Sequence, residues 1–295
     1  MKPKSSCTEF TGYSLLCEQA ANDDRIFETF RNRPEYTGVV ETVNYSTGTE
    51  YLNIVMSQSP EFADVFEKFK STDKLGNPKV YEYLYGLFSP TTLRYIKVLS
   101  DLKNYFGSLN GMKIIEIGGG YGGQCKVISD LFEFESYTLV DLEPCLRLAK
   151  KYLDKLEVKN VSYCTSHDLT GECNYDLVIS NYAFSEITRN VQDIYIKKIL
   201  NKSSRGYMLC NFITHGTQIN SYTESESINL LNNNIWALKG KPPLTSSDIS
   251  CSISLLLWGI RGGVALLKMS GGLSIAWQYF LAVSKSKLGI KRSLV

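Results

Sequence analysis

The stretch that decides the fold is MKIIEIGGGYGGQ, residues 112–124. Its first half is a short run of β-branched apolar residues, typical of a buried strand, with an acid, Glu116, near the end. Its second half has glycine at every position from 118 to 123 except Tyr121, and an amphipathic segment follows from Gln124. Glycines permit a tight turn and the close approach of a ligand, and a helix N-terminus offers free N–H groups. The stretch therefore predicts the strand, turn and helix that open a nucleotide-binding α/β domain.

The glycines fit two motifs that bind different ligands. Residues Gly118–Gly123 match G-x-G-x-x-G, the dinucleotide fingerprint, and Asp141 lies at a suitable distance along the chain to bind a ribose. Residues Glu116–Gly122 also match acid-x-G-x-G-x-G, a pattern that resembles the motif of S-adenosylmethionine (SAM) methyltransferases. Glu116 favours the second interpretation, because a carboxylate beside the loop would repel a pyrophosphate but can hold the ammonium group of SAM.

Polar residues follow the ends of several predicted strands. Short apolar strands are expected at 137–141, 161–164, 175–180 and 206–212, with helical segments between them. This alternation predicts a parallel sheet with crossover helices, in which ligands bind beyond the carboxyl ends of the strands. The residues expected to converge on one crevice are Glu116, Asp141, Asp168, Asn181 and His215.

The composition is that of an ordinary globular protein, with 295 residues of which 43% are hydrophobic and 21% charged. The net charge of +2 gives no basic excess, so no nucleic-acid partner is expected. The 8 cysteines are scattered without a C-x-x-C pair or a zinc-like spacing, and we interpret them as reduced structural thiols. Since no apolar stretch follows the first lysines, we expect no signal peptide and a cytoplasmic location.

Three regions are expected along the chain. Residues 1–110 are predicted to form a mainly helical cap or lid, with helices that begin at Ser59 and Ser89, each followed by proline. Residues 111–268 are predicted to form the α/β domain. Residues 269–295 are an apolar and basic tail, whose apolar part is shorter than the ~20 residues of a membrane span. The tail is expected to pack as a helix on the protein, with contact to a membrane surface as the alternative.

Two further elements are expected near the end of the α/β domain. A helix is predicted near 225–238. Residues 252–258 and 264–267 are expected to form a closing hairpin, because they flank the turn sequence Gly-Ile-Arg-Gly-Gly.

With these motifs in hand, the chain resembles the class I SAM-dependent methyltransferases over about residues 105–215. The resemblance rests on EIGGGYGG, on the acid of VDLE and on SNYAFSE. A narrower similarity, to the bacterial sugar O-methyltransferases, adds SPTTLRYIKVLSDL, GYGGQCKVISDL and the SLLLWG run near the C-terminus. The resemblance implies a Rossmann-like class I methyltransferase sheet, mostly parallel with helices on both faces, together with the mainly helical N-terminal lid.

The same resemblance implies a set of cofactor contacts. Glu116 and the backbone of Gly118–Gly120 would hold the methionine end of SAM, and Asp141 would accept hydrogen bonds from both ribose hydroxyls. Asp168 would meet the adenine amino group, although its sequence context also suits a turn, and Asn181 would lie near the sulfonium. The predicted cofactor-binding residues are Glu116, Gly118, Gly119, Gly120, Tyr121, Gly122, Asp141, Leu142, Asp168 and Asn181.

Methyl transfer to a sugar would benefit from a general base, because a sugar hydroxyl is a poor nucleophile at neutral pH. Two catalytic candidates follow strand ends, Glu186 after the fourth strand and His215 after the fifth. An imidazole with an ordinary pKa of about 6.5 suits the task. Either residue has a structural alternative, Glu186 as a helix cap and His215 as a plain loop residue. Glu186 and Asp193 do not form a recognisable ligand pattern, so no metal is predicted.

The sequence thus predicts a SAM-dependent O-methyltransferase for a sugar hydroxyl, in cell-surface glycan or polysaccharide biosynthesis. Three alternatives remain: a methyltransferase for another small molecule, an NAD-dependent oxidoreductase, and a non-catalytic methyltransferase-like binding module. The acid at Glu116 disfavours the oxidoreductase, and the intact acid and glycine set disfavours the non-catalytic module. Arg94 or Tyr95, on the helix before the glycine strand, is a candidate contact for the carboxylate of the cofactor, with a role in the core as the alternative. The sequence indicates no oligomeric state.

Overall fold

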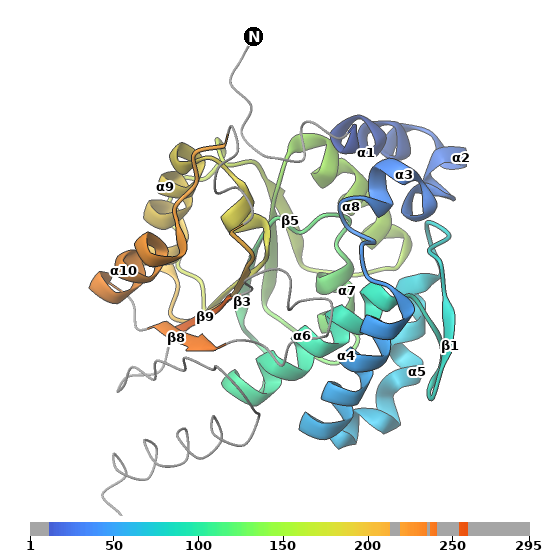
Figure 1. Ribbon diagram of the computed structural model, residues 1–295. Helices are drawn as coiled ribbons and strands as arrows, with labels where there is room; N and C mark the ends of the chain where they lie inside the picture. The colour runs from blue at the N-terminus through green and yellow to red at the C-terminus, as the bar shows by residue number, and fades with distance from the viewer. Residues whose placement is uncertain (1–11, 213–218, 235–236, 241–253, 259–295) are drawn as a thin grey trace, which may run out of the picture.

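A seven-stranded sheet runs through the centre of the molecule (Figure 1). The computed structural model describes residues 12–212, 219–234, 237–240 and 254–258. The strands of the sheet are β3 (Lys113–Ile117), β4 (Ser136–Val140), β5 (Val161–Cys164), β6 (Leu177–Asn181), β7 (Gly206–Cys210), β8 (Ala237–Gly240) and β9 (Ser254–Trp258).

The order of the strands across the sheet is β5-β4-β3-β6-β7-β9-β8. Strands β3 to β7 run parallel, while β9 is antiparallel to both of its neighbours, β7 and β8. β3 is the middle one of the five parallel strands, with β4 on one side of it and β6 on the other. The chain connections on the two sides of β3 lead in opposite directions across the sheet, which makes this a topological switch point. A ligand crevice forms at a switch point, beyond the carboxyl ends of the strands. The glycine loop follows β3 at this point.

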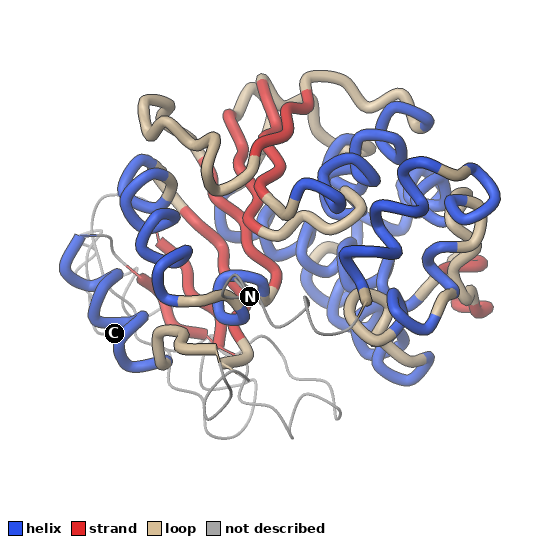
Figure 2. Tube along the Cα trace, turned by 90° about the horizontal axis from the view of Figure 1, so that it is seen from above, coloured by secondary structure: helices blue, strands red, loops and turns tan. Residues whose placement is uncertain are grey.

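Helices cover both faces of the sheet, as the view from above shows (Figure 2). Helices α6 (Pro90–Phe106), α7 (Gly123–Ser129) and α8 (Glu143–Lys155) cover one face. The other face is covered by the short segments η5 (Ala183–Glu186) and η6 (Leu200–Lys202) and by α9 (Arg189–Lys198), beside which lies α10 (Glu224–Asn234). Strand residues alternate accordingly, since Ile114 faces the first layer whereas Ile115 and Ile117 face the second. The predicted Rossmann-like sheet, with helices on both faces and a mainly helical N-terminal region, is confirmed.

The N-terminal region forms a third layer outside α6 and α8. Its helical elements are α1 (Tyr13–Asn22), α2 (Asp24–Phe27), η2 (Phe30–Asn32), α3 (Pro34–Thr37), α4 (Tyr45–Gln58), η3 (Pro60–Val65), α5 (Phe66–Phe69) and η4 (Lys70–Asp73). A small hairpin of β1 (Tyr81–Tyr83) and β2 (Gly86–Phe88) precedes α6. Helix α1 packs on α8 and helix α4 packs on α6, so this cap shares a hydrophobic core with the α/β part. The boundary predicted near residue 110 stays a prediction.

The two Ser-Pro sequences begin different structures. Ser89 caps α6 as predicted, because its hydroxyl accepts a hydrogen bond from the Thr92 N–H and Pro90 occupies the first turn. Ser59 instead precedes the 3-10 segment η3, which is followed by the single turn of α5. Ser59 is buried and its hydroxyl contacts that of Ser100 on α6 at 2.8 Å, so its side chain ties two elements together.

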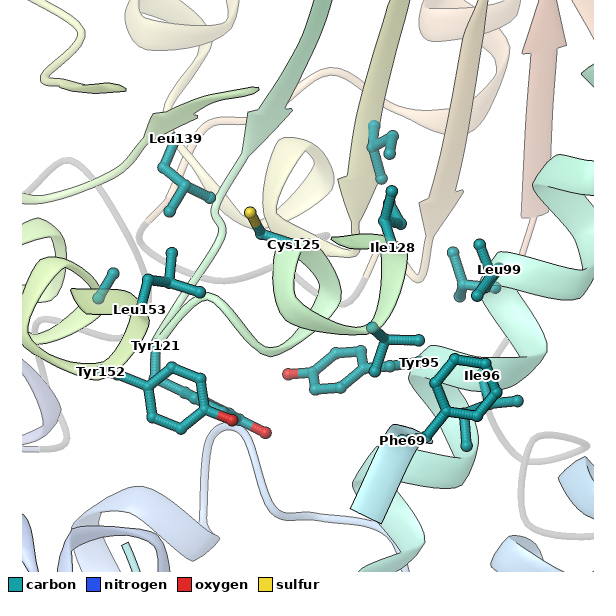
Figure 3. Close-up of a cluster of buried hydrophobic side chains, with 14 of the residues drawn as sticks. Phe69, Tyr95, Ile96, Leu99, Tyr121, Cys125, Ile128, Leu139, Tyr152 and Leu153 are labelled. Atoms are coloured by element: carbon teal, nitrogen blue, oxygen red, sulfur yellow. The ribbon is translucent and has the colours of Figure 1, made fainter. Parts of the chain in front are cut away.

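A fully buried arginine holds the cap to the glycine loop. The Arg31 guanidinium lies 2.6 Å from Glu41 and 3.0 Å from Asp73. It also donates to the Ser89 hydroxyl at 3.0 Å. Its central carbon lies 4.6 Å from the centre of the Tyr121 ring, a cation–π contact with the glycine loop. In Figure 3, Tyr121 lies between the cap and helix α8.

Parts of the C-terminal prediction need correction. The helix expected near 225–238 ends at Asn234, and residues 237–240 form strand β8 instead. Strand β9 has antiparallel partners, but they are β7 and β8 rather than the expected residues 264–267. Residues 264–267 and the tail 269–295 lie outside the described residues. Within the described ranges, no helix is long and apolar enough to cross a membrane.

We predict that Arg31→Met strongly destabilises the protein. The substitution leaves the carboxylates of Glu41 and Asp73, which are 8% and 6% exposed, without their buried cation. Breaking a buried ion pair in this way costs about 3–5 kcal/mol. Urea unfolding followed by circular dichroism measures the loss. The matched control is Arg25→Met, at a side chain that is 90% exposed, and it should change the free energy of unfolding by less than about 0.5 kcal/mol. Equal midpoints for the two variants would contradict the role of Arg31 as the buried cation.

Candidate active site

The glycine loop is packed so tightly that side chains are excluded from it. Gly118 has φ +74°, and a Cβ there would lie 2.1 Å from the Cβ of Ala183. At Gly119 a Cβ would lie 2.2 Å from a methyl group of Leu139. The backbone of the loop is therefore wedged between the segments that follow β6 and those of β4. This fixes the loop at the carboxyl end of β3.

Glu116 lies beneath this loop as a buried acid. Its side chain is 2% exposed, and the Tyr137 hydroxyl donates a hydrogen bond to Oε2 at 2.8 Å. Burial raises the pKa of Glu116 to about 8, although the hydrogen bond from Tyr137 opposes the rise. In the part of the chain that the structure describes, no lysine, arginine or histidine forms an ion pair with Glu116. The site thus contains an acid that is costly to ionise and has no cation beside it.

The side-chain amide of Asn181 borders Glu116 and contacts a second amide, that of Gln124. Asn181, at the end of β6, donates a weak hydrogen bond to Gln124 Oε1 at 3.4 Å, and Gln124 donates to the carbonyl of Tyr95 at 3.2 Å. Asn181 also hydrogen-bonds to Glu116 and lowers its pKa. The Oδ1 atom of Asn181 is buried and has no hydrogen-bond partner. An unpaired acceptor therefore lies beside the unpaired acid, which is an arrangement suited to a cationic donor.

Asp141 follows β4 and is bound to the loop. The N–H of Gly120 donates to one of its carboxylate oxygens at 3.0 Å, and the N–H of Leu142 donates to the other at 2.7 Å. Burial nevertheless raises the pKa of Asp141 to about 6. Two cap tyrosines reach the same place, because a Cβ at Gly120 would lie 3.7 Å from the Tyr13 hydroxyl and 4.0 Å from that of Tyr36. Asp141 and the cap hydroxyls thus enclose the β4 side of the loop.

The remaining predicted cofactor residues occupy different environments. Tyr121 is fully buried among cap and α8 side chains, and Gly122 packs on Leu153 of α8, so the loop backbone is the part of both that can meet a ligand. Leu142 is the N-cap residue of α8. Asp168 is exposed, and hydrogen bonds from the hydroxyl and N–H of Thr165 hold its pKa below the usual range. Asp168 therefore closes the turn after β5, and its contact with adenine stays a prediction.

Glu186 lies at the carboxyl end of β6 and β7, on the side away from β4. Asn211, which follows β7, donates to Glu186 Oε1 at 2.5 Å, and the N–H of Asn211 donates to the hydroxyl of Ser185 at 3.2 Å. The neighbouring Tyr182 has φ +74° and ψ −33°, a strained conformation for a residue with a side chain. His215 lies outside the described residues. Both Glu186 and His215 therefore stay candidates for the general base.

Sequence reasoning did not find three of the side chains that support this site. Tyr137 carries a usable signal, because strand alternation puts it on the same face of the sheet as Glu116. Gln124 is the first polar side chain after the glycines, at the start of α7, which is a weaker signal. The sequence carries no signal for Asn211, since its partner Glu186 lies 25 residues away. Among the described residues no group of His, Cys, Asp and Glu could hold a metal ion, and the absence of a metal stays a prediction.

Comparisons with known proteins give structural likeness alone. No family model matches the chain. The chain is similar to the magnesium protoporphyrin IX methyltransferase of Synechocystis solved with bound SAH, at 14% identity and TM-score 0.43 over 71% of this chain and 98% of that one. It is also similar to an rRNA methylase of Streptococcus thermophilus, at 14% identity and TM-score 0.38 over 51% and 88%. A Pyrococcus horikoshii protein matches at 14% identity and TM-score 0.44 over 57% and 90%. The fold itself, five parallel strands with helices on both faces of the sheet, is Rossmann-like.

We predict that Glu116→Gln alters how stability depends on pH. The folded pKa of about 8 lies above the ordinary value, so the stability that Glu116 contributes as a neutral acid is present at low pH and is lost as the pH rises toward 8. The glutamine stays neutral, so the variant should gain stability relative to wild type between pH 5 and pH 8.5. The gain has an upper bound of roughly 4 kcal/mol, because one pKa unit corresponds to about 1.4 kcal/mol.

Urea unfolding of both proteins at these two pH values measures the effect. Glu133→Gln, at an exposed position on the loop before β4, is the matched control and should leave the pH dependence unchanged. Parallel pH curves for wild type and Glu116→Gln would show that Glu116 is ionised in the folded protein, which contradicts a raised pKa for this buried acid.

Proposed function

We propose that the protein is a SAM-dependent O-methyltransferase that methylates a sugar hydroxyl. The observation that carries the proposal is the buried Glu116, which forms no ion pair with any described residue, beside the unpaired Oδ1 of Asn181 at the glycine loop. Two acceptors in a buried site fit an ammonium group, which has three donors and a positive charge. The methionine end of SAM carries such a group. The same acid would repel the pyrophosphate of NAD, which disfavours an NAD-dependent oxidoreductase.

Asp141 fits the ribose of the same cofactor. It lies at the end of the strand next to β3, where its two oxygens accept from Gly120 and Leu142. Each carboxylate oxygen has a second lone-pair direction, so vicinal ribose hydroxyls can bind without breaking these contacts. The hydroxyls of Tyr13 and Tyr36 add polar groups from the cap on this side. The cofactor would then extend along the edge of the sheet, with its amino-acid end at Glu116 and its nucleoside at Asp141.

The residues of this chain would act mainly by orientation. When bound, SAM supplies a methyl group on a sulfonium, which is an excellent leaving group. Methyl transfer to oxygen needs the acceptor in line with that group and sheltered from water. Glu186 lies on the β6 side of the crevice, and Asn211 holds one of its oxygens. The Glu186 carboxylate is the candidate acceptor for the proton of the sugar hydroxyl, with His215 as the alternative base.

Two features support a sugar as the acceptor. Tyr182 directly follows Asn181 and has the strained backbone that proteins retain at functional sites. Its flat ring suits the packing of a sugar ring at the acceptor side of the crevice. The second feature is the sequence resemblance to sugar O-methyltransferases. Location in the cytoplasm and contact of the tail with a membrane surface are further proposals.

We predict that the protein binds S-adenosylhomocysteine (SAH) and not NADH in calorimetric titrations. Asp141→Asn should weaken SAH binding about 10- to 100-fold, because an amide provides one acceptor oxygen in place of two and carries no charge. Asp154→Asn, at an exposed position on α8, is the matched control and should bind like wild type. NADH binding without SAH binding would overturn the cofactor, and unchanged affinity of Asp141→Asn would overturn the role of Asp141.

We predict that Glu186→Gln lowers kcat about 10²- to 10⁴-fold and leaves the affinity for SAH within threefold of wild type. The glutamine keeps the size of the side chain but cannot accept the proton. SAH formation from SAM with a panel of nucleotide sugars and glycosides measures kcat. The acid limb of the pH–rate profile should be lost with the carboxylate. Retention of both kcat and the profile would assign the base elsewhere, with His215→Ala as the next variant.

A further inference from the structure

We propose that Arg94 of helix α6 binds the carboxylate of the cofactor, so that the site recognises the whole zwitterionic end of the ligand. This proposal rests on the proposed function and specifies which part of the chain reads the amino-acid portion. Its evidence is a cation without an ion-pair partner among the described residues, which contacts the segment that follows Asn181.

Among the described residues, Arg94 lacks the carboxylate partners that the fully buried Arg31 has. Its Nη2 donates to the carbonyl of Val40 at 3.0 Å, while its Nε is buried without a hydrogen-bond partner. Arg94 forms no ion pair with any residue that the structure describes. Arg31, by contrast, has Glu41 and Asp73. A guanidinium with an unsatisfied buried donor is costly in the absence of an anion, so its surroundings fit an anionic ligand.

The position of Arg94 follows from a closed ring of contacts. The Arg94 guanidinium lies 5.8 Å from the centre of the Tyr182 ring, and Tyr182 is joined to Asn181 along the chain. Asn181 contacts Gln124, and Gln124 donates to the carbonyl of Tyr95, the neighbour of Arg94. Arg94 is thus connected through Tyr182 and Tyr95 to the amides of Asn181 and Gln124, and Asn181 borders Glu116. The cation and the acid therefore belong to one polar network at the carboxyl end of β6.

The charges of this cluster match one kind of ligand. An α-amino acid carries an ammonium and a carboxylate on the same carbon, so it can satisfy Glu116 and Arg94 together. The guanidinium is planar and presents parallel N–H groups, which match the two oxygens of a carboxylate. An inorganic anion would satisfy Arg94 but would leave Glu116 and the Asn181 oxygen unpaired. The combination therefore favours the amino-acid end of SAM over an anionic group of the acceptor.

The test compares two ligands that differ only at this end. SAH contains the amino acid, and 5′-methylthioadenosine lacks both its ammonium and its carboxylate. Arg94→Met should weaken SAH binding about 10- to 100-fold, as expected for a lost charge-assisted hydrogen bond, and should change the affinity for methylthioadenosine less than threefold. The SAH affinity of Arg94→Lys should lie between those of wild type and Arg94→Met, because lysine restores the positive charge without the planar pair of N–H donors. Arg147→Met, at a half-exposed position on α8, is the matched control and should affect neither ligand.

The contrary outcomes are distinct. An equal loss for both ligands would mean that Arg94 only supports the fold, and thermal unfolding of the variants would show this directly. Unchanged SAH affinity together with a raised KM for the sugar would assign Arg94 to an anionic group of the acceptor and overturn the proposal. Failure of the wild-type protein to bind either ligand would instead overturn the proposed cofactor itself. Failure of Arg94→Met to fold would leave Arg94→Lys and Arg94→Gln to give the same comparison.

Discussion

The burial of one acid, Glu116, is the constraint on which the site depends. Strand β3 carries Glu116 into the core just before the glycine loop begins. Tyr137 and Asn181 provide the hydrogen bonds of Glu116. A carboxyl group in this position is costly to ionise, as its raised pKa shows. Stability alone would favour an apolar or amide side chain at this position. The acid is therefore best explained by a ligand that brings a positive charge to it.

The cap gives this site a fixed wall. Arg31 binds three separate segments of the cap and lies over Tyr121, so that the glycine loop and the cap pack as one unit. Tyr121 is fully buried, although it lies within a loop whose other residues are mostly glycine. The cap also brings hydroxyl groups to Gly120, and helix α6 brings the Arg94 guanidinium to Tyr182 on the β6 side of the crevice. Segments far apart in the sequence thus form the sides of the candidate site, and the glycine loop forms its base.

Much of the fold could be predicted from local patterns, because those patterns are strong in this chain. Strand β5 has the predicted bounds, and β4, β6 and β7 begin or end within two residues of the predicted limits. The Ser89-Pro90 start of α6 was equally clear. The prediction failed where a neighbour decides the structure, since residues 237–240 become a strand only by pairing with β9. Ser59 likewise serves a contact with Ser100 rather than a regular helix.

The candidate site was predictable in its acids but not in their partners. Glu116, Asp141 and Asn181 follow strand ends, and the parallel sheet brings strand ends together whatever the rest of the chain does. Gln124, Asn211 and the unpaired state of Arg94 depend on packing between distant segments, which no local pattern encodes. Asp168 shows that an acid after a strand can instead accept hydrogen bonds within its own turn, here from Thr165.

The most direct measurement is a crystal structure of the protein with SAH. We expect the ammonium of SAH to lie within hydrogen-bond distance, about 3 Å, of Glu116 and the Asn181 oxygen, with the ribose hydroxyls on Asp141. Adenine or ribose over Glu116, or SAH bound away from the glycine loop, would contradict the central claim that this buried acid exists to hold an ammonium group.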